Sequence, residues 1–185
     1  IKVYQGSATE TINLGGQTMI PGITEAHVHS MYVAKGMFDR PYRDYSNIKE
    51  LQEVVRWLAG KLDDDAWIIV PRVPITRLTE RRHPTTAELD AACTSHPVVF
   101  TAARKSALNS LALKKLGLDG KNIPQGVEVV RDGEGKIRLL GGISGLVQKA
   151  NPGKSLDDKA LVEALGKVHA IYNSVGITSI FERAN

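Results

Sequence analysis

Apolar positions recur at helical spacing in three segments of the chain. Residues 48–62, 106–116 and about 157–175 each carry Leu, Val, Ile or Ala every three to four positions, with polar residues between them. This spacing places the apolar side chains on one side of a helix and is typical of a helix that packs against a core. The pattern therefore predicts three amphipathic helices.

Two capping patterns help to place the helix starts. Asn47 is followed three positions later by Glu50, and Thr85 is followed in the same way by Glu88. A polar cap residue with a glutamate three positions on satisfies backbone N–H groups in the first helical turn. The first pair marks the start of the helix over 48–62, and the second predicts a further short helix that ends at about Cys93.

Short runs of β-favouring apolar residues alternate with these helices. They predict strands at 23–29, 67–70, 97–101 and 177–181. Strands that alternate with helices are typical of a parallel sheet with crossover connections. We therefore predict an α/β fold in which these four strands are parallel.

A β-hairpin is predicted between the third and fourth of these strands. Residues 127–131 and 136–140 are β-favouring, and Asp132–Gly135 between them has the composition of a tight turn. The same glycines could suggest a phosphate-binding loop, but the Gly-Lys-Ser/Thr sequence and the following helix are missing. The hairpin is the better interpretation.

The remaining segments carry weaker patterns. Two short β segments, Ile1–Tyr4 and Thr11–Leu14, are predicted before the first buried strand, and Gly15-Gly16 marks a turn after them. Residues 30–46 mix aromatic residues with glycine, proline and charge, which predicts a loop.

Composition limits the function classes that remain. The chain has 185 residues, 42% hydrophobic and 24% charged residues, and a formal net charge of +4, as expected of an ordinary globular domain. The basic residues are scattered and aromatic residues make up only 5%, so no nucleic-acid interface is expected. No apolar run reaches the roughly 20 residues of a membrane span, so no membrane partner is expected.

The single cysteine, Cys93, excludes an internal disulfide and is compatible with a reducing compartment. We expect it to be a small buried residue of the core, and we expect a cytoplasmic protein. The first residue is Ile1 rather than Met, so the chain looks cut at its start and a native targeting signal would not be seen.

The candidate chemistry lies in the first predicted strand. Pro21-Gly22 forms a turn, and side chains alternate along the strand that follows, so Glu25, His27 and His29 are predicted to share one face. Two imidazoles one residue apart can bind the same divalent metal through their ring nitrogens. A plain pair of strand-end histidines is the alternative interpretation.

The segment Pro21–His29 resembles the first-strand motif of the amidohydrolase superfamily. More specifically, the chain resembles the YtcJ-like, amidohydrolase-3 branch of that family. Matching stretches follow in the same order along nearly the whole chain: 83–90, 96–100, 109–113 with 116–118, 130–133 and 176–179.

This resemblance implies a (β/α)8 TIM barrel beside a small β-sandwich. Residues 1–20 would then be residual strands of the sandwich. Residues 21–185 would form the first half of the barrel, about four βα units, with a β-hairpin insertion near 127–140. Catalytic side chains of such barrels lie at the C-terminal ends of the strands.

The resemblance also implies hydrolysis of an amide-type C–N bond by metal-activated water. His27 and His29 would be ligands of one or two divalent ions, with zinc expected, and Glu25 would be a second-shell acceptor for a ligand histidine. A buried carboxylate beside an arginine is the alternative for Glu25. The full-length enzyme would act on a small-molecule substrate.

Two departures from the family limit this expectation. Ala102–Arg104 stand where family members commonly have Asp-Gly-His, and the remaining ligands and the proton-shuttling aspartate would lie beyond residue 185. We therefore predict no catalytic residue in this chain, and no activity for the chain alone. Structural or surface roles are expected for the other histidines, which are His83, His96 and His169.

Half a barrel would leave two open sheet edges, which favour pairing with another chain. A homo-oligomer is therefore expected. The alternative function is that of a non-enzymatic truncated fragment that self-associates through these edges, with its histidines vestigial.

Overall fold

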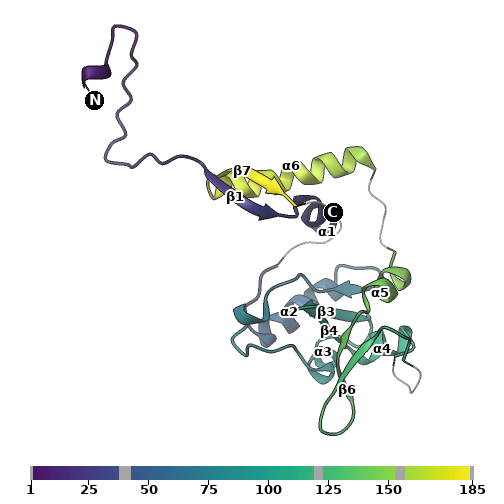
Figure 1. The fold of residues 1–185 in the computed structure, drawn as a ribbon. Coiled ribbons are helices and arrows are strands. Elements are labelled where there is room, and N and C mark those ends of the chain that lie inside the picture. Colours follow the sequence, from purple (N-terminus) through teal and green to yellow (C-terminus); the bar gives the residue numbers. More distant parts are fainter. Residues whose placement is uncertain (1, 38–42, 119–122, 153–156, 184–185) are drawn as a thin grey trace. The chain divides into compact units, whose positions relative to one another are not determined.

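The computed structural model describes the chain apart from residues 1, 38–42, 119–122, 153–156 and 184–185. The chain forms two compact units, which are described separately below (Figure 1). Unit 1 comprises Ile1–Phe38 together with Leu156–Asn185, and unit 2 comprises Asp39–Ser155. Residues 38–42 of the predicted loop over 30–46 lie outside the described residues.

Unit 1 brings together segments from the two ends of the chain. Strand β1 (Ile23–Val28) pairs in parallel with strand β7 (Ile177–Glu182). Helix α1 (Ser30–Met37) follows β1, and helix α6 (Asp158–Ser174) precedes β7. A parallel pair needs a long connection between its strands, and here α1, unit 2 and α6 together provide it.

The core of unit 1 lies between its two helices. Ala34 of α1 and Ala164 and Val168 of α6 are buried against one another. Small side chains allow the two helix backbones to approach closely. The buried stripe predicted for the long helix is confirmed in part, since Ala164 and Val168 are buried whereas Ile171 and Val175 are exposed. Asp157 caps the helix by accepting a hydrogen bond from the Ala160 N–H at 2.7 Å.

Two glycines shape the β1–β7 pair. A Cβ atom at Gly22 would overlap the side chain of Thr178, so only glycine permits β1 to begin this close to β7. Gly176 has φ +84°, a conformation that glycine adopts without strain, and it reverses the chain between α6 and β7. Both glycines therefore determine where the two strands meet.

The β segments predicted at the N-terminus are wrong for the residues described. Lys2–Tyr4 form a short 3-10 helix, and no strand is present from residue 5 to residue 20. Val3, Tyr4 and Ile12 are exposed, and β-favouring residues need a partner strand to form a ladder. The assignment of residues 1–20 to a β-sandwich stays a prediction.

The loop predicted immediately after the first strand is also wrong. Ser30–Met37 form helix α1, in which Ala34 is fully buried. The segment contains Gly36 and the aromatic residue Tyr32, which obscure helical periodicity. Its helix is stabilised by packing against α6 rather than by a strong local pattern.

Unit 2 contains a five-stranded mixed sheet in the order β2-β3-β4-β6-β5. β2 and β3 are parallel, whereas the pairs β3–β4, β4–β6 and β5–β6 are antiparallel. The strands of this sheet are β2 (Ile68–Ile69), β3 (Val98–Ala102), β4 (Lys105–Leu108), β5 (Glu128–Arg131) and β6 (Ile137–Gly141).

Helices and one 3-10 turn surround this sheet. No helix among the residues that the structure describes is long and apolar enough to cross a membrane. The helical elements of unit 2 are α2 (Ile48–Ala59), η2 (Ile75–Arg77), α3 (Thr86–Ala92), α4 (Ser110–Lys115) and α5 (Ser144–Ala150).

Strand β3 is buried on both of its faces, as its unbroken apolar sequence predicted. Val98 and Phe100 pack into one cluster with residues of α2 and α3. Val99 points to the other side and packs into a second cluster with residues of α4 and β6. Cys93 lies in the first cluster, so its predicted role as a buried core residue is confirmed.

The capping predictions in unit 2 are confirmed. The Asn47 side chain accepts from the Glu50 N–H at 2.8 Å at the start of α2. Thr85 and Glu88 form a reciprocal capping box at the start of α3. The predicted β-hairpin is confirmed as well, since β5 and β6 are antiparallel neighbours.

The prediction of one parallel sheet containing all four strands is wrong. In the described part of the chain, β1 and β7 form one sheet, whereas β2 and β3 belong to the mixed sheet of unit 2. Apolar strands that alternate with helices give the same sequence pattern in either arrangement. The pattern located the strands, but it showed neither which strands are partners nor that β1 and β7 are largely exposed in unit 1.

Candidate metal centre

The two histidines of the first strand lie together at its C-terminal end. His27 lies in β1 and His29 directly follows it, and both side chains are exposed. Their ring centroids are 5.3 Å apart, with the ring planes at 75°. Two solvent-accessible imidazoles at this spacing suit the coordination of a metal ion.

The carboxylate of Glu25 acts on the backbone of the strand. Its Oε1 accepts a hydrogen bond from the His27 N–H at 3.0 Å. The β1–β7 register is irregular between Glu25 and Val28, and these are the two half-buried positions near the end of the strand. An irregularity of this kind interrupts the strict alternation of side chains along the strand. The prediction that Glu25, His27 and His29 share one face depends on that alternation.

The ring of His29 contacts the end of strand β7. Its Nδ1 lies 3.2 Å from the carbonyl oxygen of Arg183. The Arg183 N–H in turn donates to the carbonyl of Val28 at 2.9 Å, which continues the strand pairing past Glu182. This contact was missed by sequence reasoning because it joins residues 154 positions apart.

Glu182 was also missed, and it lies at the same end of β7. Its Oε2 accepts from the Ser30 N–H at 2.8 Å and also from the Ser30 hydroxyl. These bonds from Ser30, together with nearby His29, lower the pKa of the Glu182 carboxyl below its usual value. A glutamate that ends an apolar strand was the available signal, but its partner could not be known without the pairing of β1 with β7.

The other predicted histidines have the structural or surface roles expected of them. His83 is buried in unit 2, where its Nε2 lies 2.9 Å from the Ala102 carbonyl oxygen. His96 is buried near Ser95, with 3.0 Å between the serine Oγ and its Nδ1. His169 is exposed on α6, where its ring lies 6.3 Å from that of Tyr172.

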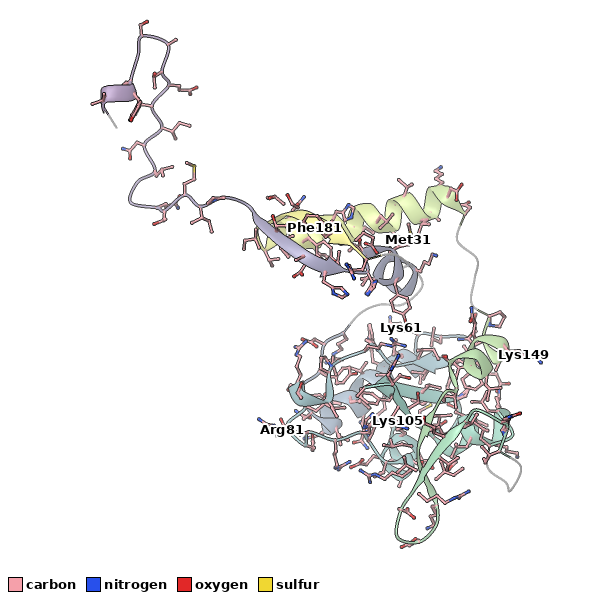
Figure 2. The ribbon with its side chains drawn as sticks, in the orientation of Figure 1. Met31, Lys61, Arg81, Lys105, Lys149 and Phe181 are labelled. Atoms are coloured by element: carbon pink, nitrogen blue, oxygen red, sulfur yellow. The ribbon has the colours of Figure 1, made fainter. Side chains whose placement is uncertain are left out.

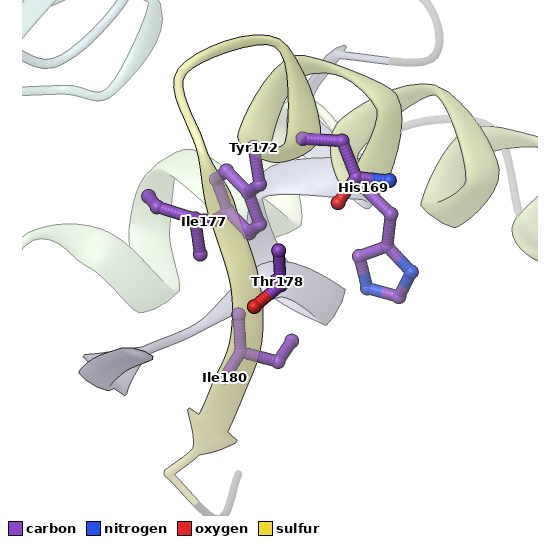
Figure 3. A pocket seen from close by; sticks show the side chains of 6 residues that line it. His169, Tyr172, Ile177, Thr178 and Ile180 are labelled. Atoms are coloured by element: carbon purple, nitrogen blue, oxygen red, sulfur yellow. The ribbon is translucent and has the colours of Figure 1, made fainter. Parts of the chain in front are cut away.

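An open pocket of about 250 Å³ lies on unit 1 between α6 and β7 (Figure 3). Its lining mixes polar and apolar side chains, and the imidazole of His169 lies at its edge in Figure 3. None of the three predicted site residues lines it. The lining residues are His169, Tyr172, Asn173, Ile177, Thr178 and Ile180.

The donor set fits a metal ion in part. His27 and His29 supply imidazole nitrogens, which divalent transition metals favour as ligands. The described residues contain no cluster of three or more His, Cys, Asp or Glu side chains placed to hold an ion. A catalytic zinc site usually has three protein ligands, so this chain supplies two of them at most among those residues.

Comparison with known families identifies the class of protein. A family model described as "Amidohydrolase family" matches residues 10–185, which is almost the whole chain. The chain therefore belongs to the amidohydrolase family. This confirms the resemblance to the amidohydrolase family that was based on the first-strand motif and the stretches after it.

One curated relative is the N-substituted formamide deformylase of Arthrobacter pascens. It is 26% identical over 181 residues, which make up 92% of this chain and 33% of that protein. The chain thus spans about a third of the length of this relative.

Two crystal structures of uncharacterised metal-dependent hydrolases are also similar to the chain. The protein from Pyrococcus furiosus matches with a TM-score of 0.43 and 18% identity. The match covers 89% of this chain and 32% of that protein. The protein from Pyrococcus horikoshii OT3 matches with a TM-score of 0.44 and 15% identity. The match covers 89% of this chain and 31% of that protein.

Proposed function

We propose that this chain carries the first-strand metal-binding residues of a metal-dependent amidohydrolase. The full-length enzyme hydrolyses an amide-type C–N bond with metal-activated water. The observation that carries the proposal is the pair of exposed imidazoles, 5.3 Å apart, at the end of β1 in a chain of the amidohydrolase family. Assignment to the YtcJ-like branch is part of the same proposal.

His27 and His29 are the residues that hold the ion, which we propose to be zinc. One or two divalent ions held by these imidazoles would supply Lewis-acid chemistry, by lowering the pKa of a bound water and polarising a substrate carbonyl. Glu25 stabilises the strand that carries the two histidines. Its hydrogen bond to the His27 N–H fixes the backbone from which one ligand projects.

We further propose that β1 and β7 are neighbouring strands of a (β/α)8 barrel. Their parallel pairing, with a helix after β1 and another before β7, supports this assignment. On this view residues 39–155, including the β5–β6 hairpin, form an insertion between two barrel strands. The chain then supplies two barrel strands instead of the four expected from sequence, and residues 1–20 belong to the adjacent β-sandwich.

The zinc content of the purified full chain tests the metal site. The intact chain should bind Zn²⁺, and His27→Ala or His29→Ala should each abolish stoichiometric binding. His169→Ala is the matched control, because it removes an exposed imidazole from the same unit. Zinc that is retained at full stoichiometry in His27→Ala would contradict the proposal.

Hydrolytic activity of the 185-residue chain is expected to be absent, because two imidazoles do not complete a catalytic zinc site. N-substituted formamides are the first substrates to assay, since the name of the Arthrobacter pascens relative points to them. Turnover at ordinary enzymatic rates with added Zn²⁺ would contradict the expectation that this chain has no complete catalytic set.

Self-association is the second candidate function. The sheet of unit 1 has two strands in the described residues, so each strand has an outer edge without a partner strand. Ile23 is 47% exposed, and Phe181, labelled in Figure 2, is 63% exposed. Sedimentation of the metal-free chain tests this candidate. A defined oligomer without bound zinc favours it, whereas a monomer that binds zinc excludes it.

A further inference from the structure

Arg183, directly after strand β7, makes two contacts with the region of His29. The Arg183 N–H donates to the carbonyl of Val28, at 2.9 Å, immediately before His29. The carbonyl of the same arginine lies 3.2 Å from His29 Nδ1. Arg183, the residue directly after β7, therefore contacts both the backbone that leads into His29 and its ring.

The contact with the carbonyl determines where the His29 ring carries its proton. A carbonyl oxygen can only accept a hydrogen bond, so His29 Nδ1 must be the donor. In the neutral ring the other nitrogen, Nε2, then has a free lone pair. The His29 side chain is exposed, so burial does not force this contact. Without the Arg183 carbonyl, water could form a hydrogen bond with either ring nitrogen.

The backbone on the other side of His29 is held by Glu182. Its carboxylate accepts from the N–H of Ser30 and from the Ser30 hydroxyl, and it also contacts the N–H of Met31. The carbonyl of His29 accepts from the Val33 N–H at 3.0 Å, the first bond of helix α1. His29 is thus fixed between the end of the sheet and a helix start that Glu182 stabilises.

We propose that Glu182 and Arg183 position His29 as a metal ligand. The Arg183 carbonyl selects the Nδ1–H tautomer and leaves Nε2 available, and the Glu182 carboxylate holds the turn from which His29 projects. The assignment of His29 as a metal ligand rests on the proposed function, whereas the tautomer of its ring and the cause of that tautomer do not. The two residues act through His29 and have no role in contact with substrate.

The tautomer of His29 is measurable in the metal-free full chain by ¹⁵N NMR of the imidazole nitrogens, at a pH well above the ordinary histidine pKa. His29 should be in the Nδ1–H form, whereas His169, whose ring is exposed, should populate both forms. Arg183→Pro removes the N–H that ties Arg183 to Val28, and it should release the ring to both forms. Arg183→Ala keeps the backbone and should leave the tautomer unchanged.

Zinc affinity supplies the second measurement, by titration of the full chain with Zn²⁺. Arg183→Pro and Glu182→Ala should each weaken binding by about ten-fold, the usual effect of losing a group that orients a metal ligand. Glu182→Gln keeps an acceptor oxygen for Ser30 and should restore most of the affinity. Glu163→Gln, on the exposed surface of α6, is the matched control and should bind as the unaltered chain does.

The outcomes separate this proposal from the proposed function. An Nε2–H ring at His29 in the unaltered chain, or an Arg183→Ala effect equal to that of Arg183→Pro, would overturn the positioning role even if zinc binds. An Nδ1–H ring in a chain that binds no zinc would support the positioning and overturn the metal site. If Arg183→Pro does not fold, the unaltered chain and the Glu182 variants still decide the question.

Discussion

The side chain of Asn109 makes four hydrogen bonds while fully buried. Its Oδ1 accepts from the N–H groups of Val98 and Ala112, and its Nδ2 donates to the carbonyls of Cys93 and His96. One amide thereby joins the ends of α3, β3 and α4. Asn109 belongs to an Asn-Ser pair that contributes to the family resemblance, and the contacts give that pair a structural role.

At the scale of residues, the sequence indicated which side chains carry candidate chemistry better than it indicated which residues they contact. His27 and His29 were recognisable as a chemical pair because they are one residue apart on a strand. Glu182 and Arg183 were not, because their contacts depend on a parallel pairing between the two ends of the chain. The burial of His83 and His96 agrees with the structural roles expected of them.

Glu88 carries a prediction about acid stability. The hydrogen-bonded Arg82 guanidinium, 2.7 Å from Glu88 Oε1, lowers the pKa of Glu88 from 4.5 to about 2 against the opposing effect of burial. A carboxyl whose folded pKa is depressed stabilises the fold above its unfolded pKa. That contribution is lost as the pH falls from 4.5 through about 2.

Glu88→Gln should therefore destabilise unit 2 by about 1–2 kcal/mol near neutral pH, a value discounted for partial exposure of the pair. The difference from the unaltered chain should shrink toward pH 2. Urea unfolding followed by tryptophan fluorescence measures this, since Trp57 and Trp67 both lie in unit 2.

Glu134→Gln is the matched control for that measurement, because the pair of Glu134 with Lys136 is largely exposed and should contribute little. A Glu88→Gln deficit that stays constant down to pH 2 would argue against the ion pair as its source.

At the scale of elements, the turn between β3 and β4 is conformationally strained. Ala103 and Arg104 have φ values of +48° and +63°, in a region that side chains other than glycine and asparagine rarely adopt. Two residues with positive φ match the type I′ turn, whose twist suits a two-residue hairpin. The hairpin was missed because its turn lacks the residues that signal one.

Arg104→Gly should stabilise unit 2 by about 0.5–1 kcal/mol, because removing the Cβ relieves more strain than the added freedom of the unfolded chain costs. The measurement is again urea unfolding by tryptophan fluorescence. Glu134→Gly, in a hairpin turn where Glu134 does not have positive φ, should be neutral or destabilising. Equal effects of the two substitutions would show that turn strain is not responsible.

Element boundaries nearby show why the β4 strand was missed. Residues 106–116 were predicted as one helix, but Lys105–Leu108 form β4 and α4 begins only at Ser110. Ser106, Ala107 and Leu108 fit either structure locally. The outcome is decided by pairing with β3 and by the Asn109 side chain, which caps α4.

For the molecule as a whole, the two units differ in how much core they have. Among the described residues, the core of unit 1 consists of Ala34, Ala164 and Val168, whereas unit 2 has two larger clusters on either face of β3. Sequence indicated the α/β class and the places of the four apolar strands, but the division into units could not be predicted. It depends on which strands pair, and the apolar pattern of a buried strand does not specify its partner.

Hydrogen exchange should therefore differ between the units. Amides in the β3–β4 ladder should exchange at least ten-fold more slowly than those in the β1–β7 ladder, because opening β3 exposes more apolar surface. Exchange followed by NMR or mass spectrometry on the full chain measures both ladders at once. Equal protection in the two ladders would indicate a single cooperative unit instead.

The pairing of β1 with β7 also has a consequence for the order of folding during synthesis. Unit 2 is complete once residue 155 has been made, and its contacts are local enough to form while the ribosome continues. The strand that carries His27 gains its partner only when residues 177–183 have emerged. The histidines of β1 therefore take up their final geometry only after residues 177–183 have been made, and a nascent chain can capture metal in this arrangement only from that point onward.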